Sequence, residues 1–476
     1  MAPLRRRRPD RALALALFAV SAATSVLLDA GLVCSNDGAH YALVRALAED
    51  HSARIDGQLG YAQGIDYSEH DGHAYSDRPP GTALAALPFY LVARALGASD
   101  AGRQFACALL AALAGALATV LTYLIARRLG LSLAGATAAA LALALCTPVR
   151  TYSSALWNHA PAAALTALTV WLALGLEEKR SSARLLALGG AAGYVVGVDY
   201  STALSSVLLV ALVGWRWRRD LGALAPLVLG CALGLAPALA YHTIAFGGPF
   251  ATPYQFHNLR YHGGVFANTR SLRAMYGGSF VEGFFGLLGS WRAGLLLYSP
   301  ILFSGFLVLP RFLRLLGRRR ALMVVAPWVL TLLVAAKHVT WHGGAPHDAR
   351  YLSAVMPLFC LPVGLALDRV HDHLGWLAGF GALFFLSATI QVVKHAAGWM
   401  RDVQPWIVAF GQTLPGDPGP TARAFLAWLF PHPIAAGCVL GLGLSAAAVL
   451  ARYGASELEA AGGRSGATAI GSPTTR

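Results

Sequence analysis

Long apolar runs, separated by short polar connections, dominate this sequence and restrict what it can fold into. A helix needs about 20 apolar residues to cross a bilayer, because each backbone N–H and C=O must be bonded within the segment. Runs near that length recur along the chain, at residues 12–33, 103–126, 131–148, 155–176, 183–198, 201–215, 221–245, 292–314, 321–337, 351–368, 374–394 and 432–451. We therefore predict an all-α polytopic membrane protein with about 12 transmembrane helices, in a range of about 11 to 13.

The charged residues are distributed as they are in membrane proteins. The chain is 56% apolar and 13% charged, with a net charge of +14. Short basic clusters fall at every second connection between the predicted spans, which is typical of cytoplasmic loops. These clusters are Arg127–Arg128, Lys179–Arg184, Arg216–Arg219, Arg311–Arg320 and Arg369. The pattern places both termini in the cytoplasm and argues against a nucleic-acid partner.

The alternation of basic and non-basic connections also divides the chain into regions on the two sides of the membrane. We predict a basic cytoplasmic N-terminus (1–11), one transmembrane domain (12–455) and a disordered cytoplasmic tail (456–476), with outer loops at 34–102, 247–291, 338–350 and 395–431. Residues 79–98 are apolar, but a crossing there would move every later basic cluster outside. We predict an interfacial or re-entrant helix for them, with a cytoplasmic turn at residues 94–103 as the alternative.

Composition and the first apolar run indicate the compartment. The run from Ala12 to Leu28 is longer than the 7 to 15 apolar residues usual in a signal peptide, which favours an uncleaved anchor. Abundant Ala, Leu, Gly and Arg with few Lys is typical of a GC-rich bacterial genome, so we predict a bacterial plasma (inner) membrane. The six cysteines are scattered singly, a pattern that indicates neither disulfides nor a zinc module.

Asp37 follows the first span and begins a stretch with loose helical spacing. One interpretation is a helix cap, since carboxylates favour the positive end of a helix. The other is a general base that accepts a hydroxyl proton while a bond to an anionic leaving group breaks.

A second polar segment, residues 66–81, contains acidic, imidazole and guanidinium groups. Asp66, His70 and His73 could bind a divalent metal, although such loops are more often simply solvated. Arg78 directly precedes the interfacial helix, where a guanidinium could grip a phosphate or anchor to lipid headgroups.

The outer segment 338–351 combines glycines with Arg350 at the start of a span. Glycines allow close backbone approach to a ligand, so Arg350 is a candidate for a second phosphate contact; a tight interfacial turn is the alternative. Tyr254 and Tyr298 could stack on a sugar or belong to an aromatic belt. Lys394 and His395, at an outer span end, are expected to snorkel. The candidate substrate-lining residues are His40, Tyr41, Asp66, His73, Asp77, Tyr298, His347 and Asp348.

The glycine pairs at 189–190 and 441–443 lie inside apolar spans, with no preceding strand, so they do not form a nucleotide-binding loop. An enzyme with this plan would take an activated substrate from the membrane.

Several elements together resemble the GT-C superfamily, and more closely the family 39-like glycosyltransferases of the protein mannosyltransferase and aminoarabinose transferase type. They are Asn36-Asp37-Gly38 with Tyr41, Asp77-Arg78-Pro79-Pro80-Gly81, and the stretch from Arg103 to Gly130, with weaker likeness at Tyr298-Ser299-Pro300 and Arg350-Tyr351-Leu352.

The resemblance implies inverting transfer of a sugar from a polyprenyl-phosphate donor to an acceptor on the non-cytoplasmic face. Asp37 would be the base, and Arg78 would lie at the lipid phosphate. The family's second acidic residue is Gly38 here, and its usual Lys is Arg78. Metal use, donor sugar and acceptor therefore stay open. The alternatives are a transporter or flippase of lipid-linked sugars, a scaffold, or a polymer ligase.

Overall fold

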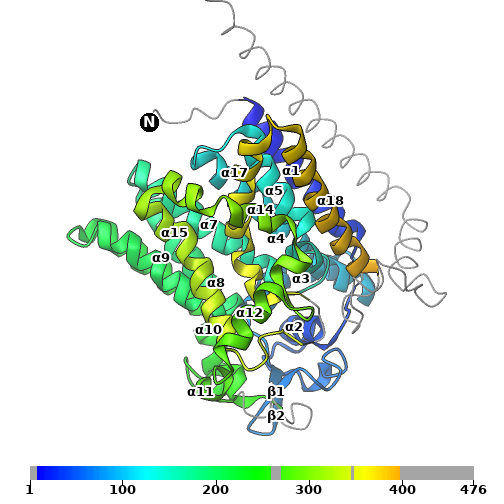
Figure 1. Cartoon of the computed structure of the whole chain (residues 1–476). Helices are drawn as coiled ribbons and strands as arrows, with labels where there is room; N and C mark the ends of the chain where they lie inside the picture. The colour runs from blue at the N-terminus through cyan, green and yellow to red at the C-terminus, as the bar shows by residue number, and fades with distance from the viewer. Residues whose placement is uncertain (1–7, 30, 259–269, 345–347, 397–476) are drawn as a thin grey trace, which may run out of the picture.

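Helices form nearly the whole of the described structure, a computed structural model that covers residues 8–29, 31–258, 270–344 and 348–396 (Figure 1). The predicted loop 395–431 beyond Ala396, the span 432–451, the tail 456–476 and His347 lie outside these residues. The first half contains α1 (Arg8–Leu27), α2 (Ser35–Arg45), η1 (Ala46–Asp50), η2 (Asp56–Gln58), β1 (Tyr67–His70), β2 (His73–Ser76), α3 (Gly81–Ala95), α4 (Asp100–Arg128), α5 (Leu133–Cys146), α6 (Pro148–Tyr152), α7 (His159–Glu178), α8 (Ser182–Val198), η3 (Tyr200–Thr202), α9 (Ala203–Arg216) and α10 (Leu221–Phe246). The second half contains η4 (Pro253–Phe256), α11 (Leu272–Met275), α12 (Phe280–Gly289), α13 (Leu295–Tyr298), α14 (Ile301–Leu307), α15 (Leu309–Lys337), η6 (Arg350–Val355), α16 (Met356–Phe359), α17 (Leu361–Val370) and α18 (Leu374–Ala396).

The membrane-spanning helices confirm the predicted class but not the count of about 12. Within the described residues, α1, α4, α7, α10, α15 and α18 are long and apolar enough to cross a bilayer, and the bent pair formed by residues 350–359 and 361–370 is a seventh candidate. The predicted spans at α5, α8 and α9 are helical but contain only 14, 17 and 14 residues. Gly317, with φ of 67°, breaks α15 between two predicted spans.

Acidic and basic side chains gather at one end of the bundle. Three ion pairs join helix ends there: Asp10 with Arg127 (2.9 Å), Glu178 with Arg128 (3.0 Å) and Glu177 with Arg320 (2.9 Å). They bring together the start of α1, the ends of α4 and α7, and the basic part of α15. The basic connections therefore lie at a common end, as the charge pattern predicts.

Residues 34–102, predicted as the first outer loop, form a folded unit at the opposite end, with a two-stranded antiparallel hairpin of β1 and β2 at its tip (Figure 1). Helix α3 stays at this end of the bundle. Its first residue, Gly81, accepts a hydrogen bond from Tyr194 near the end of α8 (2.8 Å). Its last turns return to Glu49 of the same loop, which bonds the Tyr90 hydroxyl (2.6 Å) and Arg94 (3.1 Å). Residues 79–98 thus do not cross the bundle.

Glycines hold α8 and α10 at backbone contact. A Cβ on Gly193 would lie 2.6 Å from the carbonyl oxygen of Cys231, and one on Gly234 would overlap the carbonyl of Gly190. Small residues that let backbones approach are typical of helix pairs in membranes, where packing replaces the hydrophobic effect. This pair carries Asp199 and Tyr241 to the end where the first loop lies.

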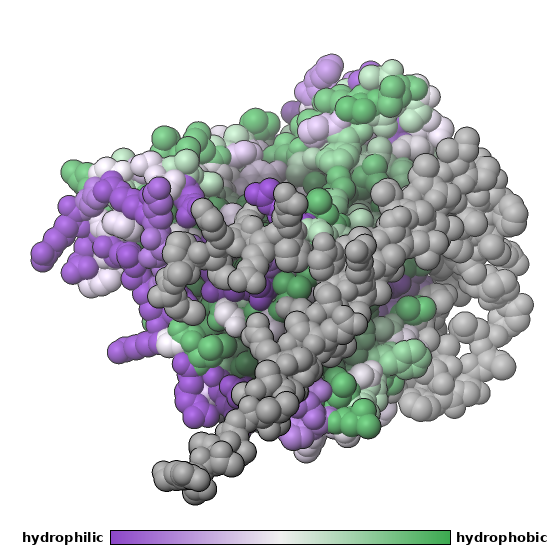
Figure 2. All heavy atoms as spheres, turned by 90° about the horizontal axis from the view of Figure 1, so that it is seen from above, coloured by the Kyte–Doolittle hydropathy of each residue, from purple (hydrophilic) through white to green (hydrophobic). Residues whose placement is uncertain are grey.

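Apolar side chains also cover much of the outer surface. Leu15, Val207, Ile244 and Phe385, on four different helices, are 71%, 64%, 73% and 74% exposed. Figure 2 shows hydrophobic residues over broad parts of one face, with hydrophilic residues gathered toward one side. A surface of this kind needs a bilayer around it, which agrees with a multi-pass membrane protein.

Candidate active site

Asp37 lies in the first turn of α2 and caps that helix. Its Oδ2 accepts a hydrogen bond from the backbone N–H of Val33 (2.7 Å), and its Oδ1 accepts from Cys34 (2.9 Å) and Gly38 (3.1 Å). The side chain is fully buried, and this burial raises the pKa of Asp37 to about 6 against the lowering effect of the three N–H groups. The capping interpretation is therefore confirmed. A carboxylate with this pKa also remains suited to proton transfer near neutral pH.

Gly38 leaves room for the neighbouring loop to pass over α2. A Cβ at this position would overlap the carbonyl group of Tyr61. The backbone of residues 61–62 thus fills the space into which a second acidic side chain would extend. A second acidic side chain beside Asp37 could therefore not be present here without a shift of the loop.

Arg78 is held by acidic and amide groups of the first loop. Its Nη2 donates to Asp66 (2.6 Å), and its Nε lies 3.1 Å from Asp77. Asn36 of α2, with its amide oxygen turned toward the guanidinium, accepts from Nε (3.3 Å) and Nη1 (3.2 Å). Burial raises the pKa of Asp77 to about 7, and Arg78 opposes that rise. The guanidinium is therefore largely neutralised by its own loop.

His40 lies one turn beyond Asp37 and is 1% exposed. Neither of its imidazole nitrogens has a hydrogen-bond partner among the described residues. Burial lowers the pKa of His40 to about 3, and the nearby Arg78 lowers it further while Asp66 opposes both. The ring is consequently neutral, with one N–H donor and one nitrogen acceptor both unused.

Arg350 begins η6 and is half-buried between aromatic rings. Its guanidinium carbon lies 5.4 Å from the centre of the Trp157 ring and 5.3 Å from that of Tyr351. A Cβ on Gly343 would lie 2.7 Å from the Arg350 Nε, so the predicted close approach of this glycine is to Arg350 itself. No carboxylate pairs with Arg350 in the part of the chain that the structure describes, and its Nε has no acceptor there.

Asp348 and Lys394 form a buried ion pair next to Arg350. The hydroxyl of Tyr152 also donates to Asp348, at 3.0 Å and 3.2 Å from its two oxygens. Lys394 is 2% exposed, so the expectation that it snorkels is wrong, because Asp348 offers the ammonium a partner inside the protein. His395 is buried too. Asp348 anchors the loop that carries Arg350 and does not line a free surface.

His159, the first residue of α7, lies near both Arg78 and Arg350. It is 5% exposed, and its Nδ1 has no partner among the described residues. Arg350, His40, Arg78 and Lys394 all lie close enough to His159 to act on it electrostatically. Tyr254 likewise lies within electrostatic reach of both Arg78 and Tyr351. The structure thus brings Arg78 and Arg350, from distant parts of the sequence, to one region.

Several predicted residues lie elsewhere. The Tyr41 hydroxyl donates to Asp100 at the start of α4 (2.8 Å), and the Tyr298 hydroxyl donates to the carbonyl of Trp291, so both hydroxyls have partners within the protein. His73 pairs with Asp56 (3.3 Å) and His70 with Asp71 (3.5 Å). Asp66 pairs with Arg78 instead of joining the two histidines, and no three His, Cys, Asp or Glu side chains of the described ranges are grouped to hold a metal. The suggested set of Asp66, His70 and His73 is therefore wrong as a ligand group.

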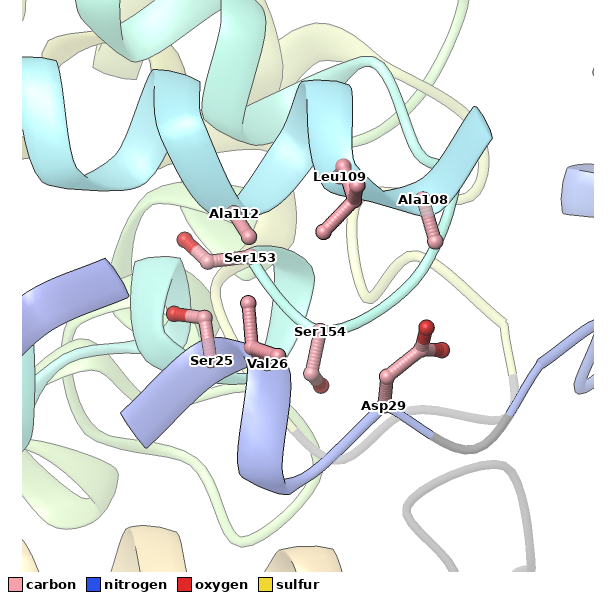
Figure 3. Close-up of a pocket in the computed structure, with 8 residues that line it drawn as sticks. All are labelled: Ser25, Val26, Asp29, Ala108, Leu109, Ala112, Ser153 and Ser154. Atoms are coloured by element: carbon pink, nitrogen blue, oxygen red, sulfur yellow. The ribbon is translucent and has the colours of Figure 1, made fainter. Parts of the chain in front are cut away.

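A small pocket lies between the end of α1, α4 and the turn that follows α6 (Figure 3). It is lined by Ser25, Val26, Asp29, Ala108, Leu109, Ala112, Ser153 and Ser154. Asp29 enters it from the segment after α1 and lies within electrostatic reach of Asp37. The pocket contains hydroxyl and carboxylate groups but neither arginine.

His159, Trp157 and Tyr152 are site residues that the sequence reasoning missed. Polar side chains at the edge of an apolar run were read as part of the span 155–176 and its flank. A histidine within a predicted span is rare enough to indicate a functional position by itself, and that signal could have identified His159.

Comparisons with known proteins agree with the fold. Residues 79–242 match the family model described as dolichyl-phosphate-mannose-protein mannosyltransferase. No curated protein matches the sequence. The crystal structure of ArnT from Cupriavidus metallidurans bound to undecaprenyl phosphate is similar with a TM-score of 0.51 and 17% identity, covering 92% of this chain and 73% of that one.

Two further solved structures are similar at lower scores. ArnT from the same organism in the apo state has a TM-score of 0.50 and 17% identity, covering 90% of this chain and 72% of that one. The Archaeoglobus fulgidus oligosaccharyltransferase complex with Zn and sulfate has a TM-score of 0.46 and 15% identity, covering 85% of this chain and 58% of that one. The ArnT matches and the family model confirm the resemblance to the GT-C superfamily as one of fold.

Proposed function

We propose, from the fold that this chain shares with ArnT, that it is a membrane glycosyltransferase that takes a sugar from a polyprenyl-phosphate donor. The family model over residues 79–242 and the ArnT structure solved with undecaprenyl phosphate support this donor class. The acceptor is a hydroxyl of a protein, lipid or glycan on the non-cytoplasmic face. The protein lies in a bacterial plasma membrane with its N-terminus and C-terminus in the cytoplasm.

The observation that carries the proposal is that Arg350 forms no ion pair within the described residues. Arg78 forms ion pairs with Asp66 and Asp77, whereas Arg350 lies over the rings of Trp157 and Tyr351, with Asp199 within electrostatic reach. A half-buried cation without a counter-ion is costly unless an anion joins it. A guanidinium matches a phosphate by two parallel N–H···O bonds. Arg350 is therefore the main ligand of the donor phosphate, and Arg78 contributes from the facing loop.

The reaction needs one base and one stabilised leaving group. Asp37 accepts the proton of the acceptor hydroxyl, whose oxygen attacks the anomeric carbon from the face opposite the phosphate. The bond between that carbon and the phosphate oxygen breaks, and polyprenyl phosphate leaves with the electron pair, so the configuration inverts. Oδ2 of Asp37 accepts a hydrogen bond from the backbone N–H of Val33, and a carboxylate oxygen has a second lone pair that can take the proton. The arginines stabilise the charge that grows on the phosphate.

The test is transfer by the purified protein. Full-length protein in lipid nanodiscs is incubated with a panel of radiolabelled polyprenyl-phosphate sugars and a membrane extract as the source of acceptor, and release of polyprenyl phosphate is measured. We expect release from at least one donor and a loss of about 100-fold or more in Arg350→Gln. Arg218→Gln, an exposed arginine beside Trp215 at the basic end, is the matched control and should keep full activity.

If the protein is instead a transporter of lipid-linked sugars, the transfer assay should release no polyprenyl phosphate. If no donor in the panel is cleaved, and reconstituted vesicles instead move a lipid-linked sugar between leaflets, then the glycosyltransferase proposal is wrong. Intact transfer in Arg350→Gln would remove Arg350 from the phosphate site.

A further inference from the structure

His40 and His159 are two buried imidazoles with unused hydrogen-bonding atoms. They come from separate elements, α2 and the start of α7, and lie close enough to act on each other electrostatically. His40 is 1% exposed with both nitrogens unpaired, and His159 is 5% exposed with Nδ1 unpaired, within the residues described. Buried polar atoms in folded proteins are nearly always bonded, so two such rings within electrostatic reach of each other require an explanation.

A role in packing alone does not explain the unpaired imidazole nitrogens. A structural histidine in a core normally donates to a carbonyl or carboxylate, as His242 does with the carbonyl of Pro249 (3.0 Å). Leaving such atoms unpaired costs free energy, which a ligand that bonds them would recover. A metal is not favoured either, since the described residues provide no third His, Cys, Asp or Glu beside this pair.

The surroundings of the pair indicate the kind of ligand. Arg78 lies near both rings, and Arg350 lies near His159. Neutral imidazoles each offer one N–H donor and one nitrogen acceptor. A sugar phosphate presents the complementary atoms, because its phosphate oxygens accept and its ring hydroxyls donate. A bare phosphate offers fewer O–H donors to the imidazole acceptors than a sugar phosphate does.

We propose that His40 and His159 bind the sugar-phosphate junction of the donor between Arg78 and Arg350, with N–H groups on the phosphate oxygens and ring nitrogens on sugar hydroxyls. This inference rests on the proposed function and adds two binding residues to it. The two rings would orient the anomeric carbon relative to Asp37, which precedes His40 by one helical turn.

The experiment measures binding and turnover separately. Full-length protein in nanodiscs is titrated with the polyprenyl-phosphate sugar that it cleaves, and with undecaprenyl phosphate, each monitored by native mass spectrometry. Inorganic phosphate and a water-soluble sugar 1-phosphate are tested as competitors. The variants are His159→Ala, His159→Asn and His40→Ala, with His371→Ala, exposed at the opposite end of the bundle, as the control.

We expect His159→Ala and His40→Ala to weaken binding of the sugar-bearing donor by about 10- to 100-fold each, and that of undecaprenyl phosphate by less, because the latter lacks sugar hydroxyls. His159→Asn, which keeps a donor and an acceptor, should recover part of the loss and confirms that the effect is not misfolding. The sugar 1-phosphate should compete better than inorganic phosphate does.

Three results would each refute a different part of the proposal. If the wild-type protein binds and cleaves the donor and both alanine variants do so equally well, then the role of the histidines is refuted while the glycosyltransferase proposal stands. If the wild-type protein binds neither lipid, then the proposed function itself fails. If the alanine variants lose both lipids equally, then the rings contact only phosphate and the sugar contact is refuted.

Discussion

The Asp37→Asn variant separates the two roles of Asp37, helix cap and general base. We expect the substitution to keep or raise the stability of the protein while it lowers the rate of sugar transfer. Burial raises the pKa of this carboxyl from 3.8 to about 6, which corresponds to about 3 kcal/mol of unfavourable charge at neutral pH. The folded state holds the Asp37 proton more tightly than the unfolded state does. The free energy of unfolding of the wild-type protein therefore decreases as the pH rises from about 4 through 6. An uncharged side chain avoids that loss.

The amide also weakens the cap. The asparagine side chain of this variant keeps one oxygen for the N–H groups of Cys34 and Gly38, but it turns an NH2 group toward the N–H of Val33, at a cost of about 1 to 2 kcal/mol. The two effects together predict a variant that is as stable as the wild type, or more stable by about 1 to 2 kcal/mol, at pH 7. Loss of the general base should lower the transfer rate by about 10²- to 10⁴-fold.

The assay pairs thermal unfolding in nanodiscs, followed by tryptophan fluorescence, with initial rates of sugar transfer. The expected result is an unchanged or higher Tm together with lost transfer. A Tm lowered by several degrees with transfer intact would show that Asp37 acts only as a helix cap and would refute the base assignment.

Three further predictions follow from the site. The transfer rate should fall about tenfold per pH unit below pH 6, because protonation of Asp37 (pKa raised to about 6) removes the base; a rate profile that is flat from pH 7 to pH 5 would contradict this. Gly38→Ala should lower the Tm by an amount that corresponds to about 1 to 3 kcal/mol, because its methyl group meets the Tyr61 carbonyl; a Tm equal to that of wild type would show that the loop shifts freely. Lys394→Met should cost about 3 to 5 kcal/mol by leaving Asp348 charged and buried, and addition of Asp348→Asn should restore most of the Tm; equal losses in the single and double variants would contradict the ion pair.

The sequence predicts the parts of this structure that depend on local pattern. Apolar length and arginine spacing identified the helices and the common end of the basic connections, because each signal lies within one segment. The pattern could not give helix length to within a turn, so α5 and α8 were counted as full spans. The break between the predicted spans 292–314 and 321–337 was placed correctly, since Gly317 interrupts α15 between them.

The site was predicted less completely, because its geometry depends on contacts between distant segments. Asp37, Arg78 and Arg350 were selected by residue type and by position at span ends. Their partners were not: Lys394 meets Asp348 across 46 residues of chain, and the Tyr61 carbonyl occupies the space above Gly38. A sequence gives no measure of which acidic group will neutralise which arginine. The sequence therefore favoured Arg78 as the phosphate ligand and offered Arg350 as a second contact, whereas the structure shows that Arg78 is paired with Asp66 and Asp77.

The proposed mechanism requires a lipid phosphate bound between Arg78 and Arg350. A cryo-electron microscopy structure of the full-length protein in nanodiscs with undecaprenyl phosphate would show this site directly. We expect phosphate density within hydrogen-bonding distance of the Arg350 guanidinium, on the side that faces Arg78 and His159. Phosphate density at the basic end near Arg127 and Arg320, with none beside Arg350, would contradict it.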